Sequence, residues 1–287
     1  MISSELLNYD SKTWNGHTHT EFCPHGSGED TELFIKRAIK SGFKTYTITE
    51  HFPMAPDFYR VAKGAEHAIT TAAMPIEELP AYFEKMNYLK KKYSGFIKIL
   101  VGFEIDYIEQ FSDWTSQMLV EYQEQIDDAI LSVHFLPTKT GLRAVDESYK
   151  DFCDGVLREY QTPIQVANAY LERILKAVKW QTDNKPKRYG HITLYRKWIR
   201  DFPVETIWED EKTKELTDRI LTRIQKNHEM LDCNMSGLKR STQQEPSPTW
   251  EIIYQAQAKG IKLVYGSDAH AVSSIDQGYT EFLNMGE

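Results

Sequence analysis

The chain has 287 residues, 41% of them hydrophobic and 12% aromatic, which is enough to bury a sizeable core in one large domain or two small ones. Its formal net charge of −8 argues against extended contact with nucleic acid, because a broadly acidic surface repels polyanions, whereas a small phosphorylated ligand needs only local positive charge. No apolar run approaches the roughly 20 residues that span a bilayer.

Predicted strands and helices alternate along the chain. A weak strand at residues 13–20 precedes a helix at 31–42, for which Asp30 and Thr31 are candidate caps. The pattern continues with strands at residues 45–52, 95–107, 127–136, 187–194, 229–237 and 260–270, and with helices at residues 76–93, 114–126, 162–180, 212–230 and 249–260. This order predicts βαβ units and a parallel sheet, and seven strands favour a closed or nearly closed barrel.

Histidines are concentrated in one early segment, WNGHTHTEFCPHGSGED. It holds His17, His19 and His25, a third of the nine histidines in the chain. A polar surface loop that happens to be rich in histidine would explain this, and so would a metal site, since neutral imidazole is a common metal ligand. The remaining predicted strands decide between these interpretations.

Ligand-competent side chains recur where the predicted strands end. Besides His17 and His19, these positions hold His51, Glu104, His134, His191, Asp268 and His270. In barrel enzymes the chemistry gathers at this face, so residues far apart in sequence are expected to converge there. One such histidine alone is more often structural, but the whole set favours a metal site.

The spacing supports the same interpretation. His17 and His19 are two residues apart, as are Asp268 and His270, so each pair faces one side of a strand. The mixed nitrogen and oxygen ligands suit Zn, Mn or Fe. There are too many ligands for one ion, and Glu104 can bridge through its two oxygens, so we expect two or three divalent ions.

Several segments resemble known motifs. HTHTEFCPH, ITEH, GFEIDY, SVHF, GHI and GSDAH are similar, in order, to motifs of the PHP (polymerase and histidinol phosphatase) superfamily. GHITLYRK, NMSGLKR and EPSP resemble the monofunctional histidinol-phosphate phosphatases of that superfamily, with Thr193 where an aspartate is common. The resemblance implies a distorted seven-stranded (β/α) barrel in a single domain, residues 1–287.

The resemblance also implies three metal positions. His17, His19, Glu104 and Asp268 would hold one ion. A second would be shared through Glu104 and completed by His134 and His191. The third would be held by His25, His51 and His270.

Further residues are candidates for contact with a small phosphorylated substrate. Arg196 and Lys197 follow the fifth predicted strand, and Lys239 and Arg240 follow the sixth; a solvated surface role is an equal alternative for the first pair. Asp106, which shares a strand face with Glu104, is a candidate partner for a cationic substrate group, although a strand-end hydrogen bond explains it as well.

Four other residues receive weaker interpretations. Glu109 is a poorer candidate than Asp106 for a cationic substrate group. Cys23 is expected to pack, with metal ligation as the less favoured alternative, and His67 and His228 are expected to be structural.

We therefore expect metal-dependent hydrolysis of L-histidinol phosphate to L-histidinol and phosphate, by direct attack of a metal-activated water. Glu104, Asp268, His270 and Arg196 are the predicted catalytic residues; the proton for the leaving group could come from bound water, His270 or Asp268. Alternatives are a phosphatase of another small monoester such as a nucleotide or sugar phosphate, a phosphodiesterase or exonuclease, and a non-catalytic metal-binding regulatory protein.

The start of the chain and its cysteines bear on the compartment. MISSELLNYDSK lacks the charged and apolar regions of a secretory signal. Cys23, Cys153 and Cys233 are odd in number and far apart, which is typical of a reducing compartment. We expect a cytoplasmic protein that acts on a small molecule and contacts neither membrane nor nucleic acid; nothing indicates its oligomeric state.

Overall fold

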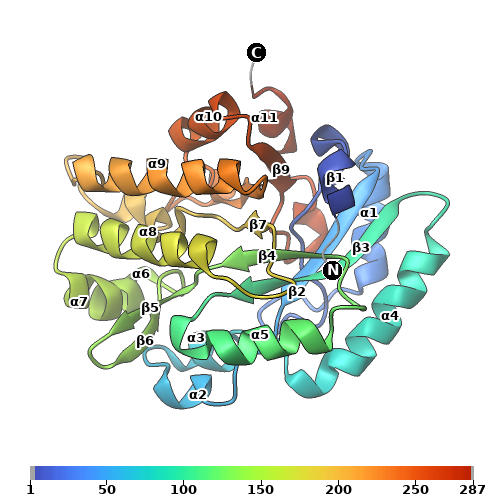
Figure 1. Ribbon diagram of the computed structural model, residues 1–287, viewed down its shortest axis with the longest axis horizontal. Coiled ribbons are helices and arrows are strands. Elements are labelled where there is room, and N and C mark those ends of the chain that lie inside the picture. Colours follow the sequence, from blue (N-terminus) through green and yellow to red (C-terminus); the bar gives the residue numbers. More distant parts are fainter. Residues whose placement is uncertain (1–3, 286–287) are drawn as a thin grey trace.

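Seven parallel strands close into a barrel in the order β1-β2-β3-β4-β7-β8-β9 in the computed structural model, which describes residues 4–285 (Figure 1). Their bounds are β1 Trp14–Asn15, β2 Thr45–His51, β3 Lys98–Asp106, β4 Asp128–Ser132, β7 Arg188–Tyr189, β8 Met230–Asn234 and β9 Lys262–Gly266. β1 pairs with both β2 and β9, which closes the sheet. The expected seven-stranded barrel in one domain is confirmed.

Helices surround the barrel on its outside (Figure 1). The α-helices are α1 Thr31–Lys40, α2 Phe58–Val61, α3 Glu66–Thr70, α4 Leu79–Lys92, α5 Ser112–Glu121, α6 Tyr149–Phe152, α7 Arg158–Tyr160, α8 Pro163–Lys179, α9 Glu211–Lys226, α10 Trp250–Ala258 and α11 Tyr279–Leu283. Side-chain caps fix the N-termini of three of the longer helices. The side chains of Asp30, Thr162 and Asp210 accept hydrogen bonds from backbone N–H groups at the starts of α1, α8 and α9. None of the helices within residues 4–285 has the length and apolar character to cross a membrane.

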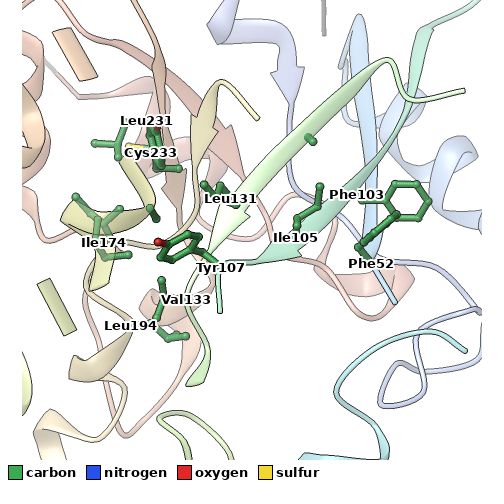
Figure 2. Packing of buried hydrophobic residues seen from close by; sticks show 14 of the residues in the cluster. Phe52, Phe103, Ile105, Tyr107, Leu131, Val133, Ile174, Leu194, Leu231 and Cys233 are labelled. Atoms are coloured by element: carbon green, nitrogen blue, oxygen red, sulfur yellow. The ribbon is translucent and has the colours of Figure 1, made fainter. Parts of the chain in front are cut away.

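The main hydrophobic core lies between the strands and these helices. Outward side chains of neighbouring strands, such as Phe103, Ile105 and Leu131, pack there with Ile174 of α8 (Figure 2). Strand alternation turns the residue between two of them, Glu104, towards the barrel interior. The outer packing therefore fixes the direction of an inner functional side chain.

Polar residues fill the barrel interior where the strands begin. Trp14 Nε1 donates a hydrogen bond of 2.8 Å to Thr47 Oγ1, which donates one of 3.1 Å to Asp128 Oδ2. The fully buried Arg188 forms an ion pair with the same carboxylate. A buried charge needs such a partner, since an unpaired one is expensive. This network closes the end of the barrel opposite the strand ends that carry the histidines.

All seven predicted strands extend beyond the observed ones, and two of them run past a point where the chain leaves the barrel. The segment 127–136 splits into β4 and β5 (Phe135–Thr138), and β5 forms an antiparallel hairpin with β6 (Gly141–Ala144). The segment 187–194 contributes only the two residues of β7, because His191 turns to φ +21° and leaves the sheet. In both cases the chain departs from the barrel at or beside a predicted ligand.

The helical run between β6 and α8 was not predicted. It consists of α6, a π-helical turn at Cys153–Leu157, and α7. Its sequence mixes aromatic, charged and glycine residues without a long apolar period, so periodicity could not reveal it.

Candidate metal centre

All nine predicted metal ligands converge at the ends of the barrel strands. They are His17, His19 and His25 after β1, His51 at the end of β2, Glu104 in β3, His134 after β4, His191 after β7, and Asp268 and His270 after β9. Most are buried, with His17 and His19 fully inaccessible and His25 exposed. Parallel strands direct their ends to one face, which explains the convergence.

Glu104 lies at the middle of this cluster. Its Oε2 is 3.2 Å from His17 Nε2, 3.6 Å from His19 Nε2 and 3.4 Å from His51 Nδ1. Its other oxygen, Oε1, is 2.7 Å from His191 Nε2. The two oxygens therefore face different sets of imidazoles, which is the arrangement that a bridging carboxylate requires.

Asp268 closes the cluster on the side of β9. Its Oδ1 is 3.3 Å from His19 Nε2, while its Oδ2 accepts hydrogen bonds from Asn234 Nδ2 at 3.1 Å and Ser236 Oγ at 3.2 Å. The residue has φ +51°, a left-handed conformation that costs free energy for a non-glycine residue. The surrounding hydrogen bonds hold it there and aim one oxygen at the histidines.

Three further carboxylates orient histidines from behind. Asp232 Oδ2 lies 3.0 Å from His17 Nδ1, and Glu50 Oε1 lies 3.3 Å from His19 Nδ1. Asp106 Oδ1 lies 3.0 Å from Nδ1 of His134. A carboxylate only accepts, so in the neutral ring each Nδ1 carries the proton and each Nε2 presents its lone pair to the cluster.

His25 and His270 provide a direct test of whether the residues fit a cation. Nδ1 of His25 lies 2.9 Å from the carbonyl oxygen of Thr71, and Nδ1 of His270 lies 3.0 Å from that of Asp268. Carbonyl oxygens only accept, so both Nδ1 atoms are protonated and both Nε2 atoms are bare in the neutral rings. These two Nε2 atoms face each other at 3.1 Å. Two opposed lone pairs repel, and a shared cation removes the repulsion.

Other buried nitrogens support the same fit. Within the described part of the chain, Nε2 of His17, Nε2 of His19 and both ring nitrogens of His51 have no hydrogen-bond partner. A buried polar atom without a partner costs free energy unless something else satisfies it. The donor set of imidazoles and carboxylates matches Zn, Mn or Fe.

The electrostatic potential differs across the cluster. Burial alone would lower the pKa of His17, but Glu104, Asp232 and Asp268 raise it well above its ordinary value. Burial and the neighbouring His19 instead lower the pKa of His270 well below its ordinary value. Negative potential that favours a proton on a ring also favours a metal cation, so the carboxylate-lined part attracts cations more strongly.

A cavity of about 720 Å³ opens over the cluster, a volume typical of small-molecule sites. Three of the four predicted substrate-contact cations line it: Lys197, Lys239 and Arg240. Two acidic residues, Asp146 and Glu147, lie on its wall. The cavity therefore offers metal ligands, cationic groups and acidic groups to one small molecule.

Arg196, a predicted substrate-contact and catalytic residue, lies beside the cavity wall and pairs with two carboxylates. Its Nη2 lies 3.2 Å from Glu245 Oε2 and its Nη1 lies 3.1 Å from Glu209 Oε1, and it is not among the residues that line the cavity. Two carboxylates pair with the guanidinium, which therefore links the segments that carry Glu209 and Glu245.

Asp106 and Glu109 also lie differently from what their proposed contact with a cationic substrate group requires. Asp106 lines the cavity, but it accepts hydrogen bonds from the backbone and ring of His134, which is the strand-end alternative. Glu109 pairs with Arg173 and Lys176 on the surface. Asp106 thus orients His134 from the cavity wall, whereas Glu109 lies outside the cavity.

The remaining candidates have simple placements. The buried Cys23 has a sulfur within 4.8 Å of ligand nitrogens of His19, His51 and His270. His67 is exposed on the cavity wall, where Nδ1 lies 3.3 Å from Glu147 Oε1, so it does not have a core structural role. His228 lies just after α9, outside the cluster.

The orienting carboxylates Asp232 and Glu50 were not found from the sequence. Alternation along β8 puts Asp232 on the inner face, whereas Leu231 and Cys233 pack outward (Figure 2), and this pattern could have revealed it. Glu50 precedes His51 on β2 and so points away from it, and no spacing rule predicts its contact with His19.

Comparison with known proteins gives consistent relatives. A histidinol-phosphatase of Bacillus subtilis (strain 168) is 34% identical over 275 residues, 94% of this chain and 97% of that protein. A crystal structure from Listeria monocytogenes, provisionally assigned as a histidinol phosphatase, is 39% identical with a TM-score of 0.91, covering 94% of this chain and 99% of that one.

A more distant structure shares the fold. The histidinol phosphate phosphatase of Lactococcus lactis subsp. lactis Il1403, crystallised with zinc, L-histidinol and phosphate, is 21% identical with a TM-score of 0.67 and covers 96% of this chain and 94% of that one. Residues 15–236 match the family model described as the PHP domain. This match extends from β1 through β8 and includes seven of the nine converging ligands. The chain therefore belongs to the PHP domain family.

Proposed function

We propose that this protein is a metal-dependent phosphatase that hydrolyses L-histidinol phosphate to L-histidinol and phosphate, a step of histidine biosynthesis. The observation that carries the reaction type is the cluster itself: imidazole and carboxylate ligands with bare nitrogens open into a cavity that Lys197 and Arg240 also line. The substrate assignment is supported by the Bacillus subtilis histidinol-phosphatase, which is 34% identical over 94% of this chain.

The nine ligands would hold two or three divalent ions, with Zn, Mn or Fe compatible with the donor set. When bound, such ions would neutralise charge on the phosphoryl oxygens and lower the pKa of water for in-line attack. Glu104 keeps its two oxygens directed at separate histidine sets, because Ser132 Oγ donates a hydrogen bond of 2.6 Å to Oε1. Its role is to set the spacing of the ions.

Arg240 is the phosphate-binding group that the geometry favours. Its Nη2 lies 3.5 Å from Asp268 Oδ2, and about a third of its side chain is exposed to the cavity. A guanidinium in this position can meet two phosphate oxygens at once. Lys197 Nζ is held by the carbonyl oxygen of Asp146 at 2.6 Å and supports the same positive region, while Lys239 lies at the rim.

Neither Asp268 nor His270 is suited to protonate the leaving group. Burial opposes ionisation of Asp268, but the neighbouring His17, His19 and Arg240 hold its pKa well below the ordinary value, so it carries no proton near neutral pH. His270 uses its one ring proton on the backbone carbonyl of Asp268. We therefore assign both residues to holding the cluster, and solvent in the cavity supplies the proton.

The acidic residues of the cavity wall match the chemistry of the substrate. Histidinol phosphate carries an amine and an imidazole beside its phosphate, and both can be cationic. Asp146 and Glu147 lie on the wall of the same cavity and can meet these groups. All three cysteines are free, which fits an enzyme of the cytoplasm, where thiols stay reduced.

A phosphate-release assay tests this function. Histidinol phosphate would be compared with p-nitrophenyl phosphate, a sugar phosphate, a nucleotide and one phosphodiester. We expect kcat/KM for histidinol phosphate to exceed that for the other monoesters by at least about 100-fold, because buried polar groups left unpaired by the wrong substrate are costly. A better sugar phosphate or nucleotide substrate would contradict the substrate assignment, and preferential cleavage of the diester would contradict the reaction type.

A further inference from the structure

The ligand cluster divides into two groups with different surroundings. The inner group consists of His17, His19, His134 and His191 around Glu104 and Asp268. The outer group consists of His25, His51 and His270, with His25 and His270 opposed at 3.1 Å and the ring centroid of His51 4.9 Å from that of His25. Both groups open to the same cavity, but they differ in charge, in hydrogen-bond partners and in exposure.

The inner group is strongly negative. Glu104 and Asp268 face its imidazoles directly, and Asp232, Glu50 and Asp106 hydrogen-bond to three of the rings from behind. A carboxylate behind a histidine makes the ring a better ligand, and losing such a partner typically costs about 10- to 100-fold in metal affinity. Each ion in this group would meet anionic as well as neutral donors.

The outer group has three imidazoles and no carboxylate of its own, with the Cys23 sulfur within 4.8 Å of the ligand nitrogens of His51 and His270. Hydrogen bonds to its rings come from the backbone carbonyl oxygens of Thr71 and Asp268, which polarise an imidazole less than a carboxylate does. His51 has no hydrogen bond on either nitrogen among the described residues, although Nδ1 lies 3.4 Å from Glu104 Oε2. An ion here would also be repelled by any ion already bound in the inner group.

The inner and outer groups also differ in the solvent exposure of their side chains. The side chains of His17 and His19 are 0% exposed, whereas that of His270 is 27% exposed and His25 lies at the protein surface. An exposed neutral site exchanges its ion with solvent more readily than a buried anionic one.

We propose that the metal cluster is graded, with a labile outer ion on His25, His51 and His270 and firmly held inner ions around Glu104 and Asp268. This inference rests on the proposed metal-dependent function. It implies that occupancy of the outer position follows the free metal concentration while the inner ions stay in place. The expected difference in dissociation constant is at least about 10-fold, the lower end of the effect of an orienting carboxylate.

The test counts ions without measuring activity. Full-length protein loaded with Zn²⁺ would be dialysed against chelators of increasing affinity for zinc, and the zinc retained per chain would be measured by elemental analysis. We expect one equivalent to leave at a weak chelator and the remainder only at a much stronger one. Release of all zinc in a single step would overturn the inference.

Two variants show which group of ligands holds the zinc that leaves at each chelator. His25→Ala should remove the early-leaving equivalent and leave the rest in place, and its exposed position makes misfolding a small risk. His67→Ala is the matched control, since this histidine lies on the same cavity wall outside the cluster and should give the wild-type pattern. Loss of all zinc in His25→Ala would also overturn the inference.

Asp232→Asn should change the release of the zinc that the inner group holds. It removes the carboxylate behind His17, so the retained equivalents should leave at a weaker chelator while the early step stays unchanged. If this variant fails to fold, Asp106→Asn makes the same test at His134. A wild-type protein that binds no zinc at all after loading would overturn the proposed function together with this inference, whereas single-step release would leave the proposed function intact.

Discussion

Single residues of the cluster act through the ring nitrogen that they leave free. Nδ1 of His17, His19 and His134 is held by a carboxylate, so Nε2 of each points to the centre. Glu104 then separates the imidazoles with its two oxygens. Replacing any of these groups changes where a cation can sit as well as how strongly it is held.

Glu104→Gln should reduce both metal content and turnover. The amide keeps the size of the side chain but removes the negative charge and one acceptor oxygen that face the histidines. We expect kcat/KM to fall by roughly 100-fold or more, with fewer bound ions by elemental analysis. His228→Ala, outside the cluster, is the control and should match the parent protein. Near-normal turnover in Glu104→Gln would exclude a bridging role.

Arg240→Met and Arg196→Met should have different effects. Arg240 faces the cavity, so its replacement should lower kcat/KM by about 10- to 100-fold, the loss expected for a charge-assisted hydrogen bond, with unchanged metal content. Arg196 pairs with Glu245 and Glu209, so its replacement should lower the melting temperature with a smaller change in KM. Steady-state kinetics and thermal unfolding of both variants would check this. A larger loss of kcat/KM in Arg196→Met than in Arg240→Met would assign phosphate binding to Arg196.

The two shortest barrel strands are followed by glycines at positions that have no room for a side chain. β1 and β7 have two residues each, and both are followed by a glycine and a histidine, Gly16 with His17 and Gly190 with His191. A side chain at Gly190 would overlap Ser132 Oγ, and one at Gly16 would overlap the guanidinium of Arg188. The glycines let the buried polar network and the metal ligands approach the same strand ends.

Gly16→Ala should destabilise the protein. The added methyl group would overlap Arg188 Nη1 and lie 2.5 Å from Val264 Cγ1, both in the closed interior of the barrel. Overpacking of this kind costs about 1–3 kcal/mol in the free energy of unfolding. Gly95→Ala is the matched control, because a methyl group there meets no atom within 4 Å. Urea unfolding of the two variants would measure the difference, and equal stabilities would show that Arg188 relaxes without cost.

The sequence allowed prediction of the elements and ligands that obey a period. Seven strands and the ligands at their ends follow from alternation and from the rule that parallel strands end at one face. Side-chain contacts between different elements do not follow the periodicity of a strand or a helix. Arg196 meets Glu245 across two loops, and Glu50 meets His19 from a neighbouring segment, so neither contact could be predicted from spacing.

At the scale of the whole molecule, the cluster joins segments that are far apart in the chain. Its ligands come from β2, β3 and the segments that follow β1, β4, β7 and β9, and β8 adds Asp232. The unfolded chain does not bring these groups together, so any ion bound here binds the folded protein alone. Binding and folding are therefore thermodynamically linked.

Removal of the metal should loosen the entire barrel. A ligand at a thousandfold excess over its dissociation constant stabilises the folded state by about 4 kcal/mol, and in large domains each kcal/mol corresponds to about 2–4 °C. One firmly held inner ion should then raise the melting temperature by roughly 8–16 °C. Calorimetry before and after chelator treatment, with metal content measured on each sample, would check this. Restoring Zn²⁺ should restore the melting temperature, and Arg240→Met, which keeps all ligands, should show the same difference. An unchanged melting temperature in a sample shown to be free of metal would mean that hydrogen bonds and packing alone hold these segments together.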